Sequence, residues 1–441
     1  MELTMDMRNE IRKLAHMEEN SYPFLSLYLN TKWEDEQQRE RIRLFTKNQF
    51  KRVFEQFDPS TPRPEDSGLR SARAARPSLP KSPTERLRVD PERRIPPPPK
   101  EQGLGAVERL KDRESWRITL IKDQQQIEKY VEGLVRHVYN EETNGMAIFS
   151  CSGSGIFLTY PSIISFENEC FISDLPILRP LVRLSSQYQT TLVVMVDTDS
   201  ARLFEVSLEG LMAESSIESY VPGRHDQGGW AQMRYQRHIK DHMDKHHKEV
   251  AEQLTELFDS GKWKRVVLIG QDRILSNFKV FLPERVRQQI TDSFSVDFSE
   301  ERSKVLRRVF ERLFQKEKEE VNHQIQVLKD RTPQGGLVAL GLNPTLEALN
   351  AGQVHALYLL TSFALPGGKC RQCGSLVLVH SPVGTSIPCP ICKGEAKVVE
   401  LGEEMMRSVL RQDGEVKWVE ENEVLKEHDG VCASLRFRLP R

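Results

Sequence analysis

The chain carries the sequence RHDQGGWAQMR at residues 224–234, and a long helical pattern begins directly after its two glycines, Gly228 and Gly229. Paired glycines let a backbone adopt positive φ angles and approach another backbone closely. Basic side chains, which suit a polyanion, surround the glycines and continue along the helix. They are Arg224, His225, Arg234, Arg237, His238, Lys240 and Lys245. The stretch predicts a glycine tip on a basic helical stalk, shaped to enter a narrow and negatively charged place.

Two interpretations compete for the histidines of this helix, which is predicted over residues 231–258. His238, His242 and His246 recur every fourth residue and therefore share one face. That spacing permits a shared metal ion. Lysines and arginines crowd the same helix and would repel a cation, so a basic surface that faces RNA is favoured.

Length and composition restrict the class of protein. The chain has 441 residues, which suggests about three domains. Its net charge of −1 means that any contact with nucleic acid depends on local basic patches. The first 19 residues are charged throughout, and no apolar run approaches the length of a membrane span. We therefore expect a cytoplasmic protein without a secretory signal or a membrane partner.

Seven cysteines include two Cys-x-x-Cys pairs, Cys370 with Cys373 and Cys389 with Cys392, separated by fifteen residues. Each pair forms a tight knuckle, and two knuckles supply the four thiolates of a tetrahedral zinc site. Four cysteines leave no open coordination position, so the predicted zinc is structural rather than catalytic. Because the segment is too small for a core of its own, we expect metal binding to hold together a zinc ribbon at residues 366–398.

Alternating helical and strand patterns predict a multidomain α/β (α+β) fold with three domains. An N-terminal α/β domain is expected at residues 1–172, and a central domain with the Gly-Gly tip and the basic helix at residues 173–296. A C-terminal domain at residues 297–441 would contain the zinc ribbon as an insertion. Its first helix reaches about residue 328, and the charged run at residues 316–320 predicts a break or kink within that helix.

The N-terminal domain is interrupted at residues 59–104 by a segment rich in proline and arginine. Residues 59–100 hold eleven prolines and ten Lys or Arg against five Asp or Glu. Such a segment cannot bury enough apolar surface to offset the entropy of ordering, so it is predicted to be disordered. It could hold RNA electrostatically or act as a passive tether, and the sequence leaves both roles open.

The stretch at residues 224–250 resembles the loop and helix of the archaeal and eukaryotic class-1 peptide release factors. In that family a Gly-Gly-Gln tip enters the ribosomal peptidyl-transferase centre. Gly228 and Gly229 match this pattern. Trp230 stands where the glutamine is expected, and the nearest glutamines are Gln227 and Gln232. The departure bears directly on whether the tip can hydrolyse an ester.

Later segments follow the same family in order. The strand, helix, glycine and strand pattern of residues 336–360 resembles the third domain of these factors and of their Pelota-type rescue relatives. The release factors also place a zinc ribbon in this region. The Asn-Ile-Lys-Ser and Tyr-Cys motifs with which they read stop codons are not found here. We therefore identify the chain as a bacterial member of the archaeo-eukaryotic release factor and Pelota superfamily, which implies binding in the ribosomal A site, contact with rRNA and peptidyl-tRNA, and a translational GTPase partner.

The sequence is compatible with three functions. In a release or rescue factor, the Gly-Gly-Trp tip would reach the peptidyl-tRNA ester, and Gln232 or Gln227 would orient the attacking water. The catalytic residues would then be Gly228, Gly229, Trp230 and Gln232. In a hibernation factor, the same shape would occupy an idle A site, and Trp230 would stack on rRNA bases. In an unrelated RNA-binding protein or zinc scaffold the ribosome would play no part. The first function is favoured, and the second follows closely.

Overall fold

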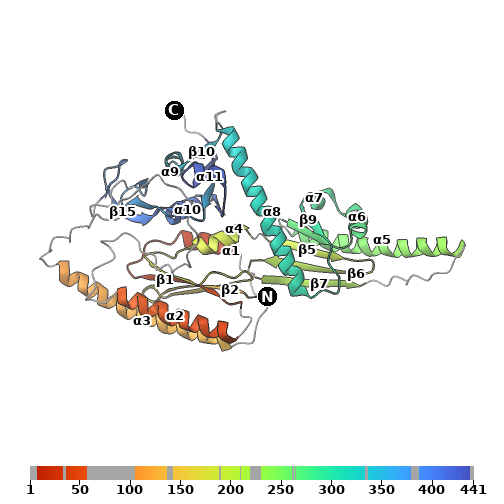
Figure 1. Ribbon diagram of the computed structural model, residues 1–441, viewed down its shortest axis with the longest axis horizontal. Helices are drawn as coiled ribbons and strands as arrows, with labels where there is room; N and C mark the ends of the chain where they lie inside the picture. The colour runs from red at the N-terminus through yellow and green to blue at the C-terminus, as the bar shows by residue number, and fades with distance from the viewer. Residues whose placement is uncertain are drawn as a thin grey trace.

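The computed structural model describes residues 7–32, 36–56, 105–136, 143–187, 190–208, 210–218, 230–260, 263, 265–332, 336–378 and 387–437. Within these residues the chain forms four β-sheets with helices between and around them, which is the mixed α/β fold predicted from the sequence. In Figure 1 the N-terminal and C-terminal sheets lie together at one end of the molecule, and the central sheet lies at the other. The predicted Pro/Arg-rich insertion and the Gly-Gly tip lie outside the described residues.

The N-terminal sheet is antiparallel, with the strand order β3-β2-β1-β4. Its strands are β1 (Phe24–Asn30), β2 (Gly145–Cys151), β3 (Ile156–Ser162) and β4 (Glu169–Ser173). Side chains alternate between the two faces of a strand. In β1, Leu25 and Leu27 therefore contribute to one hydrophobic cluster, and Phe24 and Tyr28 contribute to another on the opposite face. The sheet is consequently buried on both sides.

Two helices, α2 (Glu36–Gln56) and α3 (Gly105–Arg136), cover the outer face of this sheet as an antiparallel pair. The apolar face of α2 is turned to the sheet, because Ile42, Phe50 and Val53 are buried in the same cluster as the β1 leucines. An ion pair joins the two helices, with Arg43 Nε and Glu132 Oε1 2.9 Å apart. The opposite faces of the helices point away from the sheet, at the bottom of Figure 1.

The central sheet has the strand order β7-β6-β5-β8-β9, in which β5, β8 and β9 are parallel. Its strands are β5 (Thr191–Val196), β6 (Ser200–Ser207), β7 (Gly210–Glu218), β8 (Arg265–Ile269) and β9 (Ile290–Phe294). α5 (Trp230–Asp259) and α6 (Asp272–Phe281) cover the face that buries Leu192 and Val194, and a short helix, α7 (Glu284–Arg287), precedes β9. The first half of α8 (Arg302–Arg331) covers the face that buries Val193 and Met195. β5 and β8 are thus buried on both faces, as parallel strands usually are.

The C-terminal part of the chain contains two further sheets. The larger has the order β10-β17-β11-β16, built from β10 (Val338–Leu340), β11 (Val354–Leu360), β16 (Glu415–Val419) and β17 (Val431–Leu435). The smaller has the order β13-β12-β15-β14, built from β12 (Pro366–Cys370), β13 (Leu376–Leu378), β14 (Ile387–Pro388) and β15 (Glu395–Glu400). The helices of this part are α9 (Leu342–Asn350), α10 (Leu401–Arg411) and α11 (Glu423–Glu427). The smaller sheet is the predicted ribbon. The four cysteines of the two Cys-x-x-Cys pairs lie in its strands or in the turns beside them.

The N-terminal and C-terminal sheets share one hydrophobic core. α1 (Met7–Ala15) and α4 (Arg179–Gln187) lie between them, and α10 closes the core from the C-terminal side. Ile11 of α1, Leu181 of α4 and Met405 of α10 are all buried in this one cluster. Because one core extends through both regions, they form a single body that is joined by more than the covalent chain.

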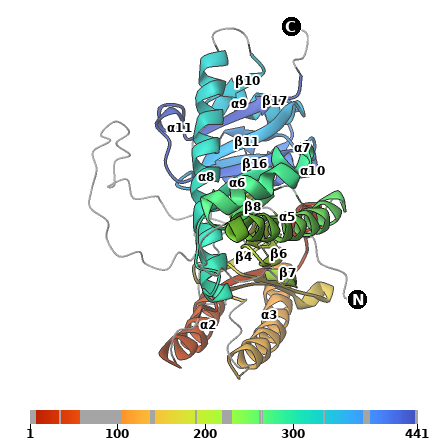
Figure 2. The same cartoon turned by 90° about the vertical axis from the view of Figure 1, so that its right-hand side faces the viewer.

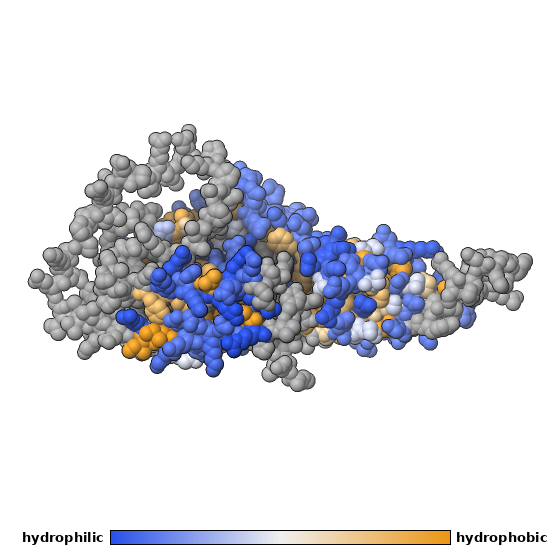
Figure 3. Space-filling model, turned by 60° about the horizontal axis from the view of Figure 1, so that its bottom comes forward, coloured by the Kyte–Doolittle hydropathy of each residue, from blue (hydrophilic) through white to orange (hydrophobic). Residues whose placement is uncertain are grey.

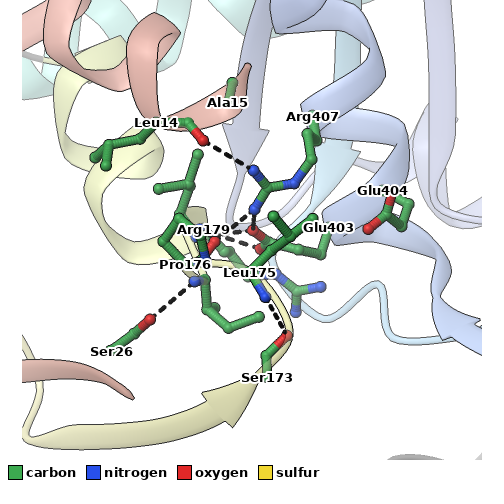
Figure 4. A network of polar contacts seen from close by, with 12 residues as sticks. Leu14, Ala15, Ser26, Ser173, Leu175, Pro176, Arg179, Glu403, Glu404 and Arg407 are labelled. Carbon is green, nitrogen blue, oxygen red and sulfur yellow. Dashed lines mark hydrogen bonds and ion pairs between the residues drawn. The ribbon is translucent and has the colours of Figure 1, made fainter. Parts of the chain in front are cut away.

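A polar network crosses the same interface from α10 (Figure 4). Glu403 and Arg407 lie one turn apart and are 6% and 1% exposed. Glu403 accepts hydrogen bonds from the backbone nitrogens of Leu178 and Arg179, at 2.7 and 3.2 Å, where α4 begins. Arg407 donates to the backbone oxygen of Leu14, at 3.1 Å, in the last turn of α1. A carboxylate at a helix N-terminus and a cation at a helix C-terminus both match the helix dipole.

α8 is one continuous helix, so the break predicted at residues 316–320 is wrong. Its first half buries Val309 against the central sheet, and its second half buries Ile325 in the core shared by the other two sheets. Between them, Glu317 is 5% exposed and forms ion pairs with Arg265 of β8 and Lys417 of β16. Figure 2 shows the helix running along both regions. The charged run does not break the helix because its buried carboxylate is neutralised from two other elements.

The pKa of Glu317 predicts how this junction responds to acid. Burial alone would raise the pKa, but the Lys417 ammonium and the Arg265 guanidinium outweigh burial and hold it below the ordinary value of 4.5. A carboxyl whose pKa is lowered by folding stabilises the fold above its unfolded pKa, and this contribution is lost as pH falls through the folded pKa. We expect Glu317→Gln to remove that acid-dependent loss and to cost about 3–5 kcal/mol at neutral pH, because the buried Arg265 and the partly buried Lys417 lose their counter-charge.

Urea unfolding of the wild type and of Glu317→Gln across acid and neutral pH measures both effects. Glu319→Gln is the matched control, since Glu319 is exposed on the same helix. A surface carboxyl of this kind is expected to change stability by less than about 0.5 kcal/mol. Equal costs for the two substitutions would contradict the role assigned to Glu317.

Candidate functional site: the α5 stalk and the cysteine ribbon

α5 is a 30-residue helix, which corresponds to a length of roughly 45 Å. Its C-terminal half packs against the central sheet through Val250, Ala251 and Leu254. Its N-terminal half extends beyond the sheet, toward the right-hand end of Figure 1. The long helix predicted after the two glycines is therefore confirmed, and half of it has the form of a stalk.

The predicted RNA-binding residues are distributed along this stalk. Arg237, His238, Lys240 and Lys245 are exposed. Trp230, Gln232 and Arg234 belong to the first two turns of α5. The predicted site residues Arg224, His225, Gly228 and Gly229 lie outside the described residues, so their role as a tip stays a prediction.

Where the stalk meets the sheet, α5 buries two neighbouring histidines. His246 and His247 are 1% and 0% exposed. His247 Nε2 lies 3.3 Å from the backbone oxygen of Asp197, and its ring packs edge-on against Phe278 and Phe281 of α6. Burial lowers the pKa of both histidines, which favours their neutral forms. They anchor the helix and do not extend its basic surface.

The histidine spacing along α5 does not produce a metal site in the described residues. His238 and His242 are ring neighbours, with centroids 4.5 Å apart, but His246 is turned into the protein interior. Within the part of the chain that the structure describes, the cysteines form the one group of three or more residues close enough to share a metal ion. The interpretation of α5 as a basic surface that faces RNA stays a prediction.

The four cysteines form a compact set. Their sulfur atoms lie within 4.8 Å of one another, with Cys370 and Cys392 3.4 Å apart and Cys373 and Cys389 3.7 Å apart. Zinc–sulfur bonds of about 2.3 Å in a tetrahedron place sulfurs about 3.8 Å apart. The donor set and its spacing thus fit one Zn²⁺ with four protein ligands, which would serve a structural role.

Both knuckles have the same backbone geometry. The nitrogen of Gly374 donates to the oxygen of Cys370 at 3.0 Å, and the nitrogen of Lys393 donates to the oxygen of Cys389 at 2.9 Å. Gly374 and Lys393 follow the second cysteine of each pair and have φ angles of 72° and 63°. This repeated left-handed turn brings the two sulfurs of each pair to one side, which explains why the Cys-x-x-Cys spacing alone predicted the site.

The ribbon is also attached to the helices beneath it. Lys369 forms an ion pair with Glu404 of α10, with Nζ and Oε2 2.9 Å apart. The Asn350 side chain at the end of α9 makes hydrogen bonds of 2.8 Å with both the nitrogen and the oxygen of Leu376. A metal held by the cysteines would therefore stabilise a platform that is continuous with the C-terminal sheet.

Comparison with known proteins agrees with this arrangement. Residues 176–313, which include the Gly-Gly sequence and α5, match the model of the bacterial archaeo-eukaryotic release factor family 10. A Pelota homologue of Thermococcus onnurineus is 26% identical over 266 residues, which make up 58% of this chain and 64% of the relative. The chain is related to the archaeo-eukaryotic release factors and to Pelota. This confirms the superfamily predicted from the tip, the basic helix and the ribbon, although the chain spans less than two thirds of the length of its curated relative.

Similar solved structures belong to the same group. Ribosome-bound archaeal Pelota, from a model that also contains ABCE1, is 19% identical, covers 69% of this chain and 80% of its own, and has a TM-score of 0.36. Dom34 of S. cerevisiae, a translation termination-like factor that interacts with Hbs1, is 12% identical, covers 67% of this chain and 80% of its own, and has a TM-score of 0.35.

None of the helices in the described residues is both long and apolar enough to cross a bilayer.

Proposed function

We propose that this protein is a ribosome-binding translation factor of the release and rescue class. The observation that carries the proposal is α5, a basic helix that extends from the central sheet within the stretch that matches the release factor family. Its exposed basic side chains are suited to rRNA phosphates, and the Gly-Gly sequence directly precedes its first residue. The stalk would enter the A site and place the tip at the peptidyl-transferase centre.

Hydrolysis of the peptidyl-tRNA ester is the activity proposed for the tip. Gly228 and Gly229 would allow the backbone to approach the ester, and Gln232 would orient a water molecule against it. The ribosome would provide most of the catalysis, and the factor would position the water molecule. In this scheme Trp230 fills the place beside the glycines and does not take part in proton transfer.

The alternative is a hibernation factor, and the observation that favours it is Trp230 itself. A large aromatic side chain stacks on nucleobases of any sequence but cannot orient water as an amide does. Such a factor would occupy the A site of an idle ribosome without releasing a peptide. It would use the same stalk and the same basic residues.

The proposed partners follow from the relatives. The Pelota structure mentioned above is bound to the ribosome, and Dom34 interacts with Hbs1. For this chain we propose the ribosome, through rRNA and peptidyl-tRNA, and a translational GTPase that docks on the later sheets. The zinc ribbon would contribute a rigid surface there, and the factor would act in the cytoplasm, where ribosomes are.

Single-turnover peptide release distinguishes the two functions. Ribosomes with labelled peptidyl-tRNA in the P site and an empty A site would be mixed with the protein in the presence of a stop codon, a sense codon or no codon. Release without a stop codon is expected for a rescue factor. Tight binding without release for any codon would overturn the hydrolytic proposal and support hibernation.

Gln232→Ala tests the assignment of the water-orienting residue. We expect it to slow release about 100-fold, since misplacing a reacting group by about 1 Å can have an effect of that size. Gln236→Ala, one helical turn further along α5, is the control and should leave the rate unchanged. Full activity of Gln232→Ala would remove that residue from the mechanism and direct attention to Gln227.

A further inference from the structure

We propose that the outer face of the α2–α3 helix pair is a second RNA-binding surface, which contacts the phosphate backbone independently of base sequence. It lies in the N-terminal region and is separate from the α5 stalk. The proposal rests on the proposed function only in taking the RNA to be ribosomal. Binding of RNA itself follows from the charge and geometry of the two helices.

Eight of the nine exposed charged side chains that the structure describes on the two helices are basic. Among their described residues, the exposed basic side chains are Arg41, Lys47, Lys51, Arg52, Arg117, Lys122, Lys129 and Arg136. The exposed acidic side chain among the same residues is Glu40. The whole chain has a net charge of −1, so this face departs strongly from the average composition. Clustered bases along a helix are the electrostatic signature of nucleic-acid binding.

Most of these basic side chains have no acidic partner among the side chains that the structure describes. No described acidic residue forms an ion pair with the four exposed bases of α2 or with Arg117, Lys122 and Lys129 of α3. By contrast, the half-buried Arg43 between the helices is paired with both Glu40 and Glu132. Glu132 thus serves the contact between the helices, and the outer basic side chains have no described counter-charge.

The geometry suits a nucleic-acid backbone. Arg41 and Arg52 are separated along α2 by roughly 16 Å, and Arg117 and Arg136 along α3 by roughly 28 Å, at 1.5 Å per residue. Two adjacent helices form a broad ridge that does not fit the deep, narrow major groove of A-form RNA. Contact with phosphates across the shallow groove requires no insertion, so the binding should depend on shape and charge.

The position of this face favours a role different from that of the stalk. The helix pair lies at the bottom of Figure 1 under the N-terminal sheet, whereas α5 extends from the opposite end of the molecule. Figure 3 brings the bottom forward and shows a mainly hydrophilic side with small hydrophobic spots. Two separate contacts on one RNA assembly raise the overall affinity, because the second binding event becomes intramolecular.

A membrane surface is the competing partner for a basic helix, and the direction of the apolar stripe argues against it. A helix that lies on a membrane turns its apolar face toward the lipid. Here the apolar faces of α2 and α3 are turned inward and cover Leu25 and Leu27 of β1. The exposed apolar side chains on the outer side are the isolated Leu44 and the pair Ile118 and Ile121.

The test uses the full-length protein and a fluorescent RNA duplex of about 20 base pairs, which offers more than one shallow groove. The variant Lys47→Gln/Lys51→Gln/Arg52→Gln removes three charges from α2. We expect it to bind about 10- to 100-fold more weakly and to lower the slope of log affinity against log salt by about 2 to 3. The control Arg273→Gln/Arg307→Gln/Arg331→Gln removes three exposed charges from α6 and α8, and it should change neither quantity.

Two outcomes would overturn the proposal. One is equal RNA affinity for the helix-pair variant and the control. The other is binding of vesicles containing phosphatidylserine that the helix-pair substitutions abolish while RNA binding is unchanged, which would assign the face to anionic lipid.

Sedimentation with ribosomes separates this proposal from the preceding one. If the protein does not bind ribosomes but the helix-pair variant still loses RNA affinity, the proposed function fails and the RNA surface stands. A second result is also possible, in which ribosome binding depends on Arg237, Lys240 and Lys245 of α5 and the α2 substitutions change neither RNA binding nor ribosome binding. In that case the RNA surface fails and the proposed function stands.

Discussion

Replacing Cys370 by serine is expected to abolish metal binding and to unfold the ribbon formed by β12 to β15. The four cysteines offer one complete tetrahedral set, and a serine hydroxyl is a poor zinc ligand at neutral pH. The ribbon has a very small core, made of Cys370, Val377, Cys389 and Ala396. Two of these four side chains are ligands themselves, so half of the interior depends directly on the metal. Binding free energies of structural zinc in small domains reach about 10–16 kcal/mol, which makes metal removal the largest effect predicted for this chain.

Elemental analysis and hydrogen exchange measure this effect together. The wild type should contain about one zinc ion per chain, and Cys370→Ser should contain almost none. Amide protection should be lost in β12 to β15 and retained in β5 and β8 of the central sheet. Cys432→Ala is the control, because Cys432 is buried in β17 outside the cysteine set and should leave the zinc content unchanged. A metal-free wild type with a fully protected ribbon would contradict the structural role of zinc.

The ribbon and the stalk could be predicted from the sequence because each depends on local spacing. Two Cys-x-x-Cys pairs determine a knuckle whatever surrounds them, and the apolar positions after Gly229 define a helix within a single segment. The structure confirmed both the helix and the close approach of the cysteines. The exposed bases of α2 and α3 were also present in the sequence, but their shared face became evident only when both helices were placed on the N-terminal sheet.

Long-range partners explain where sequence reasoning was insufficient. The charged run of α8 predicted a break because nothing nearby indicates that Glu317 meets Arg265, 52 positions away, and Lys417, 100 positions away. His246 was placed on one face of α5 with His238 and His242, since a histidine beside lysines gives no sign that the central sheet will bury it. In each case a charged or polar residue was assigned to the surface, and a distant element buried it.

Arg407 is another charged residue that distant elements bury, and Arg407→Met is expected to destabilise the protein by about 3–5 kcal/mol. The side chain is 1% exposed and donates hydrogen bonds to the backbone oxygens of Leu14, at 3.1 Å, and Pro176, at 2.5 Å. It also lies 3.5 Å from the Glu403 carboxylate. Methionine fills a similar volume but satisfies none of these acceptors, and it leaves Glu403 without its nearest cation.

The loss of stability should depend on the burial of the arginine that is replaced. Removing an exposed charge at the same interface should not have this effect. Arg183 of α4 forms an ion pair with Glu420 across the same boundary, at 2.8 Å, but the two side chains are 38% and 39% exposed. Arg183→Met should therefore cost less than about 1 kcal/mol in urea unfolding. Combining Arg407→Met with Glu403→Gln should cost less than the sum of the single substitutions, because the carboxylate left unpaired by the first is removed by the second. If Arg407→Met cost no more than Arg183→Met, the N-terminal and C-terminal sheets would be held together by their shared hydrophobic core alone, and the network on α10 would contribute alignment without stability.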